Sequence, residues 1–175
     1  MLKNRMIMGF LFLFLVQCTA AQTPKDRPRS QSSKLDKTLR AMLHFSVPTI
    51  SVDSLKNMND RVLLDARAQK EFDVSHIPTA QYCGYDHFDP SVLAGIPKDK
   101  NIVVYCSIGV RSEKIAEKIK ALGYTHVSNL YGSLFEWVNT GNSVVDKTGS
   151  ETRKVHAFSR LWSIYLDGKK AEKVW

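Results

Sequence analysis

Residues 103–112 read VVYCSIGVRS. The apolar start is typical of a buried parallel strand, and from Ser112 to Leu122 apolar residues recur at helical spacing. Cys106 therefore lies in a short loop between a strand and a helix. Because ligands of open α/β sheets bind at the carboxyl ends of the strands, Cys106 lies at the edge where a site is expected.

The loop after Cys106 has the features of an anion-binding turn. Its backbone N–H groups and the helix N-terminus favour negative charge, which lowers the pKa of a thiol and makes it a better nucleophile. Gly109 permits a tight turn, and Arg111 either holds the loop carbonyls or meets an anionic substrate. The alternative is an inert buried cysteine, but the Gly-x-Arg-Ser end of the loop favours a nucleophile.

Strand and helix signals alternate on both sides of this loop. We expect strands at 49–52, 62–65, 80–83, 102–105 and 125–130, and helices or helical turns at 53–58, 68–72, 90–94, 112–122 and 133–139. This alternation predicts an α/β fold with a central, mostly parallel sheet of about five strands and helices on both faces. Another helix is expected over residues 34–44, capped by Ser32 or Ser33.

The C-terminal extension, residues 141–175, follows a Gly-Asn turn. Val155, Phe158, Trp162 and Tyr165 fall at helical spacing with basic residues between them, which predicts a C-terminal helix. We expect this helix to cover part of the core. The alternative is a basic amphipathic face that contacts a membrane or a partner.

Residues 1–17 predict an export signal. Lys3 and Arg5 precede an apolar run over residues 7–16. As a helix this run is about 15 Å long, too short for a bilayer core of about 30 Å but suitable for a secretory signal. We therefore expect the protein to leave the cytoplasm and to lie in the periplasm or on a membrane of a bacterial cell envelope.

The end of the export signal resembles a bacterial lipobox. Residues 15–18 read LVQC, so Cys18 is the expected site of lipid attachment and membrane association. Cleavage after Ala20 or Ala21 is the alternative, because Gln17 is larger than the residue usually found before the lipidated cysteine. Residues 18–33 are polar and contain two prolines, which predicts a tether.

The composition excludes several classes of protein. A length of 175 residues with 43% hydrophobic and 24% charged residues fits one compact domain with extensions. Three cysteines are too few for a disulfide scaffold or a four-cysteine zinc site. Loss of residues 1–17 lowers the net charge from +8 to +6, and no nucleic-acid-binding motif accompanies the basic residues. The histidines show no metal-ligand spacing: His44, His76, His87, His126 and His156.

The Cys-x-x-Gly-x-Arg-Ser loop after a Val-Val-Tyr strand resembles the active loop of rhodanese-like sulfurtransferases. Other segments resemble the same family in order: LDAR at 64–67 with EF at 71–72, SHIPTA at 75–80, and LYGS at 130–133 with Trp137. The resemblance covers roughly residues 48–140 and implies a rhodanese-like three-layer domain. Ser75, Thr79 and Ser133 stand where the family usually has glycine, so we expect local backbone adjustment there.

The resemblance implies sulfur transfer by double displacement through a Cys106 persulfide. Arg111 would support the loop and the anion, and the other loop residues would bind the substrate: Ser107, Ile108, Gly109, Val110 and Ser112. The implied substrates are small sulfur-containing anions or thiols, and no metal or organic cofactor is needed. Asp65 and Arg67 are expected to form a buried structural pair, and Glu71 and His76 to support the site.

Three alternatives compete with this interpretation. A phosphatase or arsenate reductase of the same fold needs an arginine six positions after the cysteine, whereas here Arg111 is at the fifth. A non-catalytic binding module is typical of family members that have lost the cysteine. A redox-sensing module would use a Cys83–Cys106 disulfide, although a packing role for Cys83 is the simpler expectation. Ser107 and Ile108 are uncharged, which argues against thiosulfate as the physiological donor.

Overall fold

The predicted strands form one five-stranded parallel sheet. The computed structural model describes residues 24–175, and its sheet has the order β1-β5-β4-β2-β3. The strands are β1 (Thr49–Ile50), β2 (Arg61–Asp65), β3 (Gln81–Tyr82), β4 (Asn101–Tyr105) and β5 (Val127–Leu130). The predicted α/β fold is confirmed. The export signal and Cys18 lie outside the described residues.

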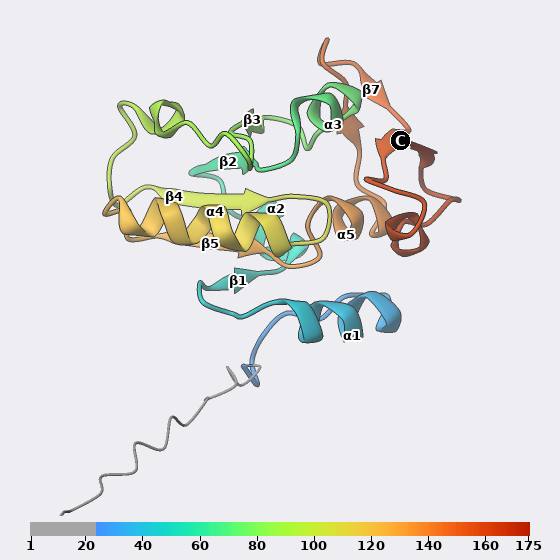
Figure 1. Cartoon of the computed structure of the whole chain (residues 1–175), viewed down its shortest axis with the longest axis horizontal. Helices are drawn as coiled ribbons and strands as arrows, with labels where there is room; N and C mark the ends of the chain where they lie inside the picture. The colour runs from blue at the N-terminus through green and yellow to red at the C-terminus, as the bar shows by residue number, and fades with distance from the viewer. Residues whose placement is uncertain (1–23) are drawn as a thin grey trace, which may run out of the picture.

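Side chains along β4 pack into two different layers. Val103 and Tyr105 join the core beneath α1 (Ser33–Met42), α2 (Val52–Lys56) and α5 (Ser133–Asn139). Ile102 and Val104 join the core beneath α4 (Val110–Ala121), which lies across β4 and β5 in Figure 1. Because successive strand residues point to opposite faces, an uninterrupted apolar run fills both layers and buries the strand.

Helix boundaries follow local capping. The hydroxyl of Ser32 accepts a hydrogen bond from the Leu35 amide at the start of α1, as the sequence predicted. The hydroxyl of Ser51 does the same for Ser54 at the start of α2. The predicted turn at 68–72 is α3 (Gln69–Val74), and that at 90–94 is the 3-10 helix η1 (Pro90–Leu93).

The predicted C-terminal helix is wrong. Residues 141–175 instead form β6 (Val144–Val145) against β7 (Glu151–Thr152), β8 (Lys154–His156) against β9 (Glu172–Val174), and a short 3-10 helix, η2 (Trp162–Tyr165). The apolar residues that fell at helical spacing belong to different elements. Val155 is buried within β8, whereas Phe158 has a φ of 64°, a conformation outside any right-handed helix. The stability gained from strand pairing and core burial outweighs the helical preference that the spacing of the apolar residues indicated.

The C-terminal extension is packed firmly onto the domain. Val155, Ala157, Leu166 and Ala171 are buried in the same core as α5. The Tyr165 hydroxyl is hydrogen-bonded to Thr38 of α1 at 2.9 Å. In Figure 1 the extension, orange to red, lies at the end of the sheet toward which the β4 arrow points. None of the helices within residues 24–175 has the length and apolar character to span a bilayer.

Candidate active site

Cys106 directly follows β4 and is 2% exposed. Its amide donates to the Ser133 hydroxyl at 3.1 Å, and its Sγ accepts a hydrogen bond from the Gly109 amide at 3.1 Å. Helix α4 begins at Val110, two residues before the predicted start, which brings its first turn closer to the sulfur. Gly109 has a φ of 124°, which L side chains rarely adopt, so the turn depends on glycine here.

The surroundings of Cys106 stabilise a thiolate. Burial alone raises the pKa of the Cys106 thiol, because it disfavours the charged form. The positive charge of Arg111 and hydrogen bonds from Ser112 and Gly109 act in the opposite direction and prevail. The pKa of Cys106 therefore lies below its ordinary value, as expected for a nucleophilic thiol at a helix N-terminus.

Arg111 is held by a carboxylate from α3. Its Nη1 lies 2.7 Å from Glu71 Oε2, its Nη2 lies 2.9 Å from Glu71 Oε1, and Nη2 also donates to the Ser107 hydroxyl at 3.0 Å. Glu71 is buried, and Arg111 holds the pKa of its carboxyl below the ordinary value against the opposing effect of burial. Arg111 thus fixes the loop through a side chain rather than through loop carbonyls.

Asp65 and Arg67 form the expected buried pair. Both side chains are 0% exposed, and the shortest contact, Arg67 Nη2 to Asp65 Oδ2, is 2.6 Å. The same nitrogen donates to the Ser75 carbonyl at 2.6 Å and ties the α3 turn to the end of β2. Neither side chain hydrogen-bonds to Cys106, so the pair supports the turn and does not meet the sulfur.

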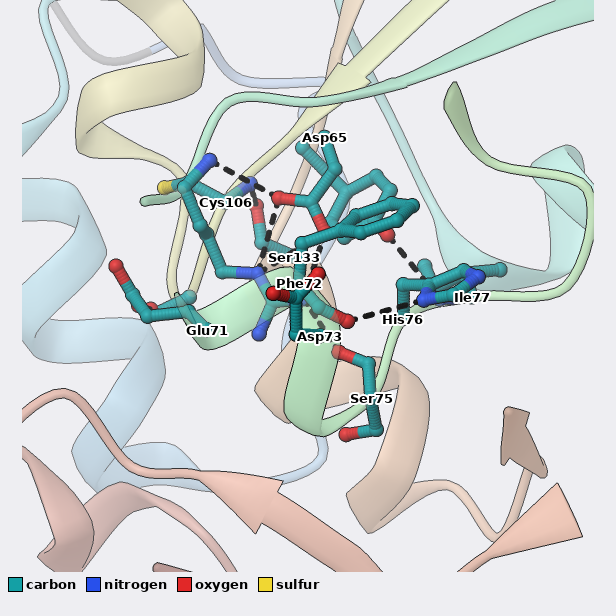
Figure 2. Close-up of polar contacts among 12 residues, drawn as sticks. Asp65, Glu71, Phe72, Asp73, Ser75, His76, Ile77, Cys106 and Ser133 are labelled. Atoms are coloured by element: carbon teal, nitrogen blue, oxygen red, sulfur yellow. Dashed lines mark hydrogen bonds and ion pairs between the residues drawn. The ribbon is translucent and has the colours of Figure 1, made fainter. Parts of the chain in front are cut away.

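His76 is a structural residue of the turn after α3. Figure 2 shows its ring lying face to face with Phe72, with ring centroids 3.8 Å apart. Its Nδ1 is 3.1 Å from the Phe72 carbonyl, and its backbone pairs with Val145 of the C-terminal extension. The histidine therefore fixes the turn against the extension, and it lies in none of the hydrogen bonds of Cys106.

Two of the three residues at glycine positions keep a glycine-like backbone. Thr79 and Ser133 have φ values of 71° and 51°, whereas Ser75 is extended. Ser133 also contributes a contact that glycine cannot make: its hydroxyl accepts from the Cys106 amide and donates to the Leu130 carbonyl at 3.0 Å. Sequence reasoning noted Ser133 only as a departure from the family and missed this contact.

Cys83 is buried and its thiol is free, as is that of Cys106. It packs in the core beneath α4 and donates to the Asp65 carbonyl at 3.3 Å. Burial and the nearby Asp65 carboxylate raise the pKa of Cys83 to about 12. The structure thus shows a packing role for Cys83 and no Cys83–Cys106 disulfide.

An apolar cavity of about 180 Å³ opens beside Cys106. Its apolar lining includes Ile108 of the loop, Val110 at the start of α4, Met42 of α1, and Phe158 and Trp162 of the C-terminal extension. The last three residues were missed as site residues, because they lie outside the segment that resembles the family. The sequence offered one signal for them: Phe158 and Trp162 are two aromatic residues in an extension to which no function had been assigned.

The chain belongs to the rhodanese-like domain family. The family's sequence profile, described as the rhodanese-like domain, matches residues 51–140. A sulfurtransferase of Allochromatium vinosum is 33% identical over 95 residues, which are 54% of this chain and 88% of that protein. The sequence and site described above are therefore those of a rhodanese-like sulfurtransferase family member.

Other relatives differ in overall length and description. A tRNA uridine(34) hydroxylase of Listeria welshimeri is 36% identical over 43% of this chain, but the match covers only 25% of that protein. The crystal structure of a thiosulfate sulfurtransferase from Pseudomonas aeruginosa matches with a TM-score of 0.53 and 23% identity, over 57% of this chain and 20% of that one. This last likeness shows the fold alone.

Proposed function

We propose that this protein is an exported sulfurtransferase that moves sulfane sulfur through a Cys106 persulfide. The observation that carries the proposal is the position of the Cys106 sulfur. It lies at the carboxyl end of a buried strand and accepts a hydrogen bond from the Gly109 amide at 3.1 Å. The pKa of the Cys106 thiol is lowered by the charge of Arg111 and by hydrogen bonds from Ser112 and Gly109 at the N-terminus of α4. A buried cysteine with only a packing role, such as Cys83, has a raised pKa instead.

The first half-reaction loads the enzyme. The Cys106 thiolate attacks the outer sulfur of a donor such as thiosulfate or a persulfide. A sulfur–sulfur bond forms to Cys106 while the bond inside the donor breaks, and the rest of the donor (sulfite, or a thiolate) leaves with the electron pair. The first-turn amides of α4 lack helical partners and supply donors for the charge on the terminal sulfur.

The second half-reaction unloads it. A thiolate acceptor, or cyanide in an assay, attacks the terminal sulfur of the persulfide and takes it as a new persulfide or as thiocyanate. The Cys106 thiolate leaves and is regenerated, and no external oxidant or reductant is consumed. The role of Arg111 and of the loop amides is to keep both anionic forms of Cys106 stable although the residue is only 2% exposed.

The decisive assay is intact-mass detection of the persulfide. After treatment with thiosulfate or a small persulfide and removal of the donor, the wild type should gain the mass of one sulfur, and cyanide should remove it. Cys106→Ser should gain nothing, while Cys83→Ser, the matched control, should behave as the wild type does. A wild type that no donor loads, yet which binds another protein, would favour the non-catalytic binding module.

The second element of the proposal is the location. The basic n-region, the apolar run and the lipobox-like LVQC support export and attachment of lipid at Cys18, which would place the domain at the cell envelope. The tether predicted over residues 18–33 is shorter than expected, because Arg27 and Ser30 are hydrogen-bonded to Tyr131 and Glu136 of the domain. Detergent phase partitioning tests this directly. The full chain should enter the detergent phase and Cys18→Ala the aqueous phase; aqueous partitioning of both would rule out the lipid anchor.

A further inference from the structure

We infer that the sulfur substrate of this site carries an apolar group about the size of one aromatic ring, which binds between Phe158, Trp162 and Met42. The inference rests on the proposed function and adds the substrate class to it. It is carried by three features of the wall beside Cys106: its chemistry, its backbone and its anchoring. All three involve segments outside residues 51–140, the part that matches the family.

The chemistry of the wall is almost entirely apolar. Cys106 is part of the cavity lining, together with the apolar side chains of Met42, Ile108, Val110, Phe158 and Trp162. The volume of about 180 Å³ is sufficient for a benzene-sized group, since a dry apolar cavity of about 150 Å³ in a protein can hold benzene. A ring bound there would lie next to the sulfur that Cys106 attacks.

The one positive charge in this wall is already compensated. Arg111 gives two hydrogen bonds to the Glu71 carboxylate and one to Ser107, and the Phe158 ring lies over its guanidinium with the ring centroid 5.0 Å away. An incoming dianion such as thiosulfate would therefore meet one arginine whose charge already serves the Glu71 carboxylate and the Cys106 thiolate, and an aromatic face beside it. An organic substrate with less charge would depend less on this arginine for its binding free energy, and burial of its apolar group would strengthen binding.

The backbone of Phe158, beside the cavity, is strained. Its φ is 64°, a left-handed conformation that a bulky residue rarely adopts. The residue is also 48% exposed, although a large aromatic side chain gains no stability from contact with water. Its amide donates to His156 Nδ1 at 3.1 Å, directly after β8. Strain of this kind concentrates at ligand-binding positions, where the surrounding structure maintains it.

The wall is rigid enough to discriminate between substrates. On one side of Phe158, β8 pairs with β9 and buries Val155 and Ala157. On the other side, Tyr165 of η2 is tied to Thr38 at 2.9 Å and its carbonyl accepts from Asn139 at 2.9 Å. Because the segment that carries both aromatic rings is anchored by β8 before Phe158 and by the Tyr165 contacts after Trp162, the cavity is formed before the substrate arrives.

The test compares two thiosulfonate anions that differ only in the apolar group, benzenethiosulfonate and methanethiosulfonate. In each reaction the Cys106 thiolate takes the outer sulfur and the corresponding sulfinate leaves. The second-order rate of persulfide formation is followed by intact mass and divided by the rate of the same reagent with free cysteine. This normalised phenyl-to-methyl ratio should be at least about tenfold in the wild type, the range for added apolar groups in a hydrophobic pocket.

Three variants make the test specific. Phe158→Gly removes the ring without backbone strain, because glycine adopts positive φ freely, and it should lower the ratio several-fold. Trp162→Ala should do the same. Leu161→Ala is the matched control, since Leu161 lies in the same segment, is 73% exposed and is not part of the cavity lining; it should keep the wild-type ratio.

Each remaining outcome overturns the inference. A wild-type ratio near one with normal persulfide formation would mean that the apolar wall does not bind the substrate, and would point to a macromolecular partner for the exposed aromatic side chains. An equal loss in Phe158→Gly and Leu161→Ala would mean that the segment acts only through folding. If no reagent loads Cys106 at all, the sulfurtransferase proposal fails and this inference fails with it.

Discussion

The buried Asp65–Arg67 pair provides the sharpest test of how this site is supported. Asp65 accepts hydrogen bonds from the Arg67 amide at 3.0 Å, from Nε at 2.9 Å and from Nη2 at 2.6 Å, and both side chains are fully buried. Asp65→Ala would leave the Arg67 guanidinium buried without its counter-charge. The expected loss is about 3–5 kcal/mol of unfolding free energy.

The control is another aspartate in an ion pair. Asp60 pairs with Lys100 at the surface, where the Asp60 side chain is 82% exposed, so Asp60→Ala should change stability by no more than about 1 kcal/mol. Urea unfolding followed by fluorescence measures both variants. For a chain of this length the loss at Asp65 corresponds to a fall in melting temperature of about 6–20 °C.

Replacement of both partners separates charge from packing. Within residues 24–175, Arg67 Nη1 has no hydrogen-bond partner, so the pair is not fully satisfied even in the native state. Asp65→Val combined with Arg67→Met should therefore recover much of the stability lost in Asp65→Ala, as apolar replacements of buried ion pairs often do. If Asp65→Ala is no more destabilising than Asp60→Ala, the account of this pair as the support of the turn is refuted.

Three further predictions concern titration and reactivity. Arg111→Met should raise the pKa of Cys106, seen as a shift of the alkylation pH profile to higher pH; an unshifted profile would mean that Arg111 does not stabilise the thiolate. Cys83, with its pKa near 12, should resist alkylation at pH 8 in the native double variant Cys18→Ala, Cys106→Ser, where it is the one remaining thiol, and modification detected by intact mass would contradict its burial. Arg27 lowers the pKa of Asp36 to about 2 from 3.8, so the stability of the wild type should fall between about pH 4 and pH 2. Asp36→Asn should show a weaker decline in pH-dependent unfolding, and an identical slope would exclude this pair.

Much of the sheet and its order of elements could be predicted because the signals are local. Apolar runs such as 102–105 leave no face for water, and Ser32 caps α1 by a contact within three residues. The C-terminal extension could not be predicted in the same way. Its strands are only two or three residues long, and β8 pairs with β9, a strand that lies beyond η2 in the sequence.

The candidate site divides along the same line. The sequence by itself determined the position of Cys106 and the form of its loop, because the strand, Cys106, Gly109 and the start of α4 follow closely in the chain and their geometry is set by local backbone preferences. It also indicated the Asp65–Arg67 pair, whose members are two residues apart.

Only the tertiary structure decided what surrounds that loop. The pairing of Glu71 with Arg111, the hydroxyl of Ser133 on the Cys106 amide, and the Phe158 ring over the guanidinium join segments tens of residues apart. The physical reason is that such contacts depend on how the helices and the extension pack against the carboxyl edge of the sheet. This packing depends on burial of apolar surface from many segments at once, so the periodicity of any one segment does not predict it.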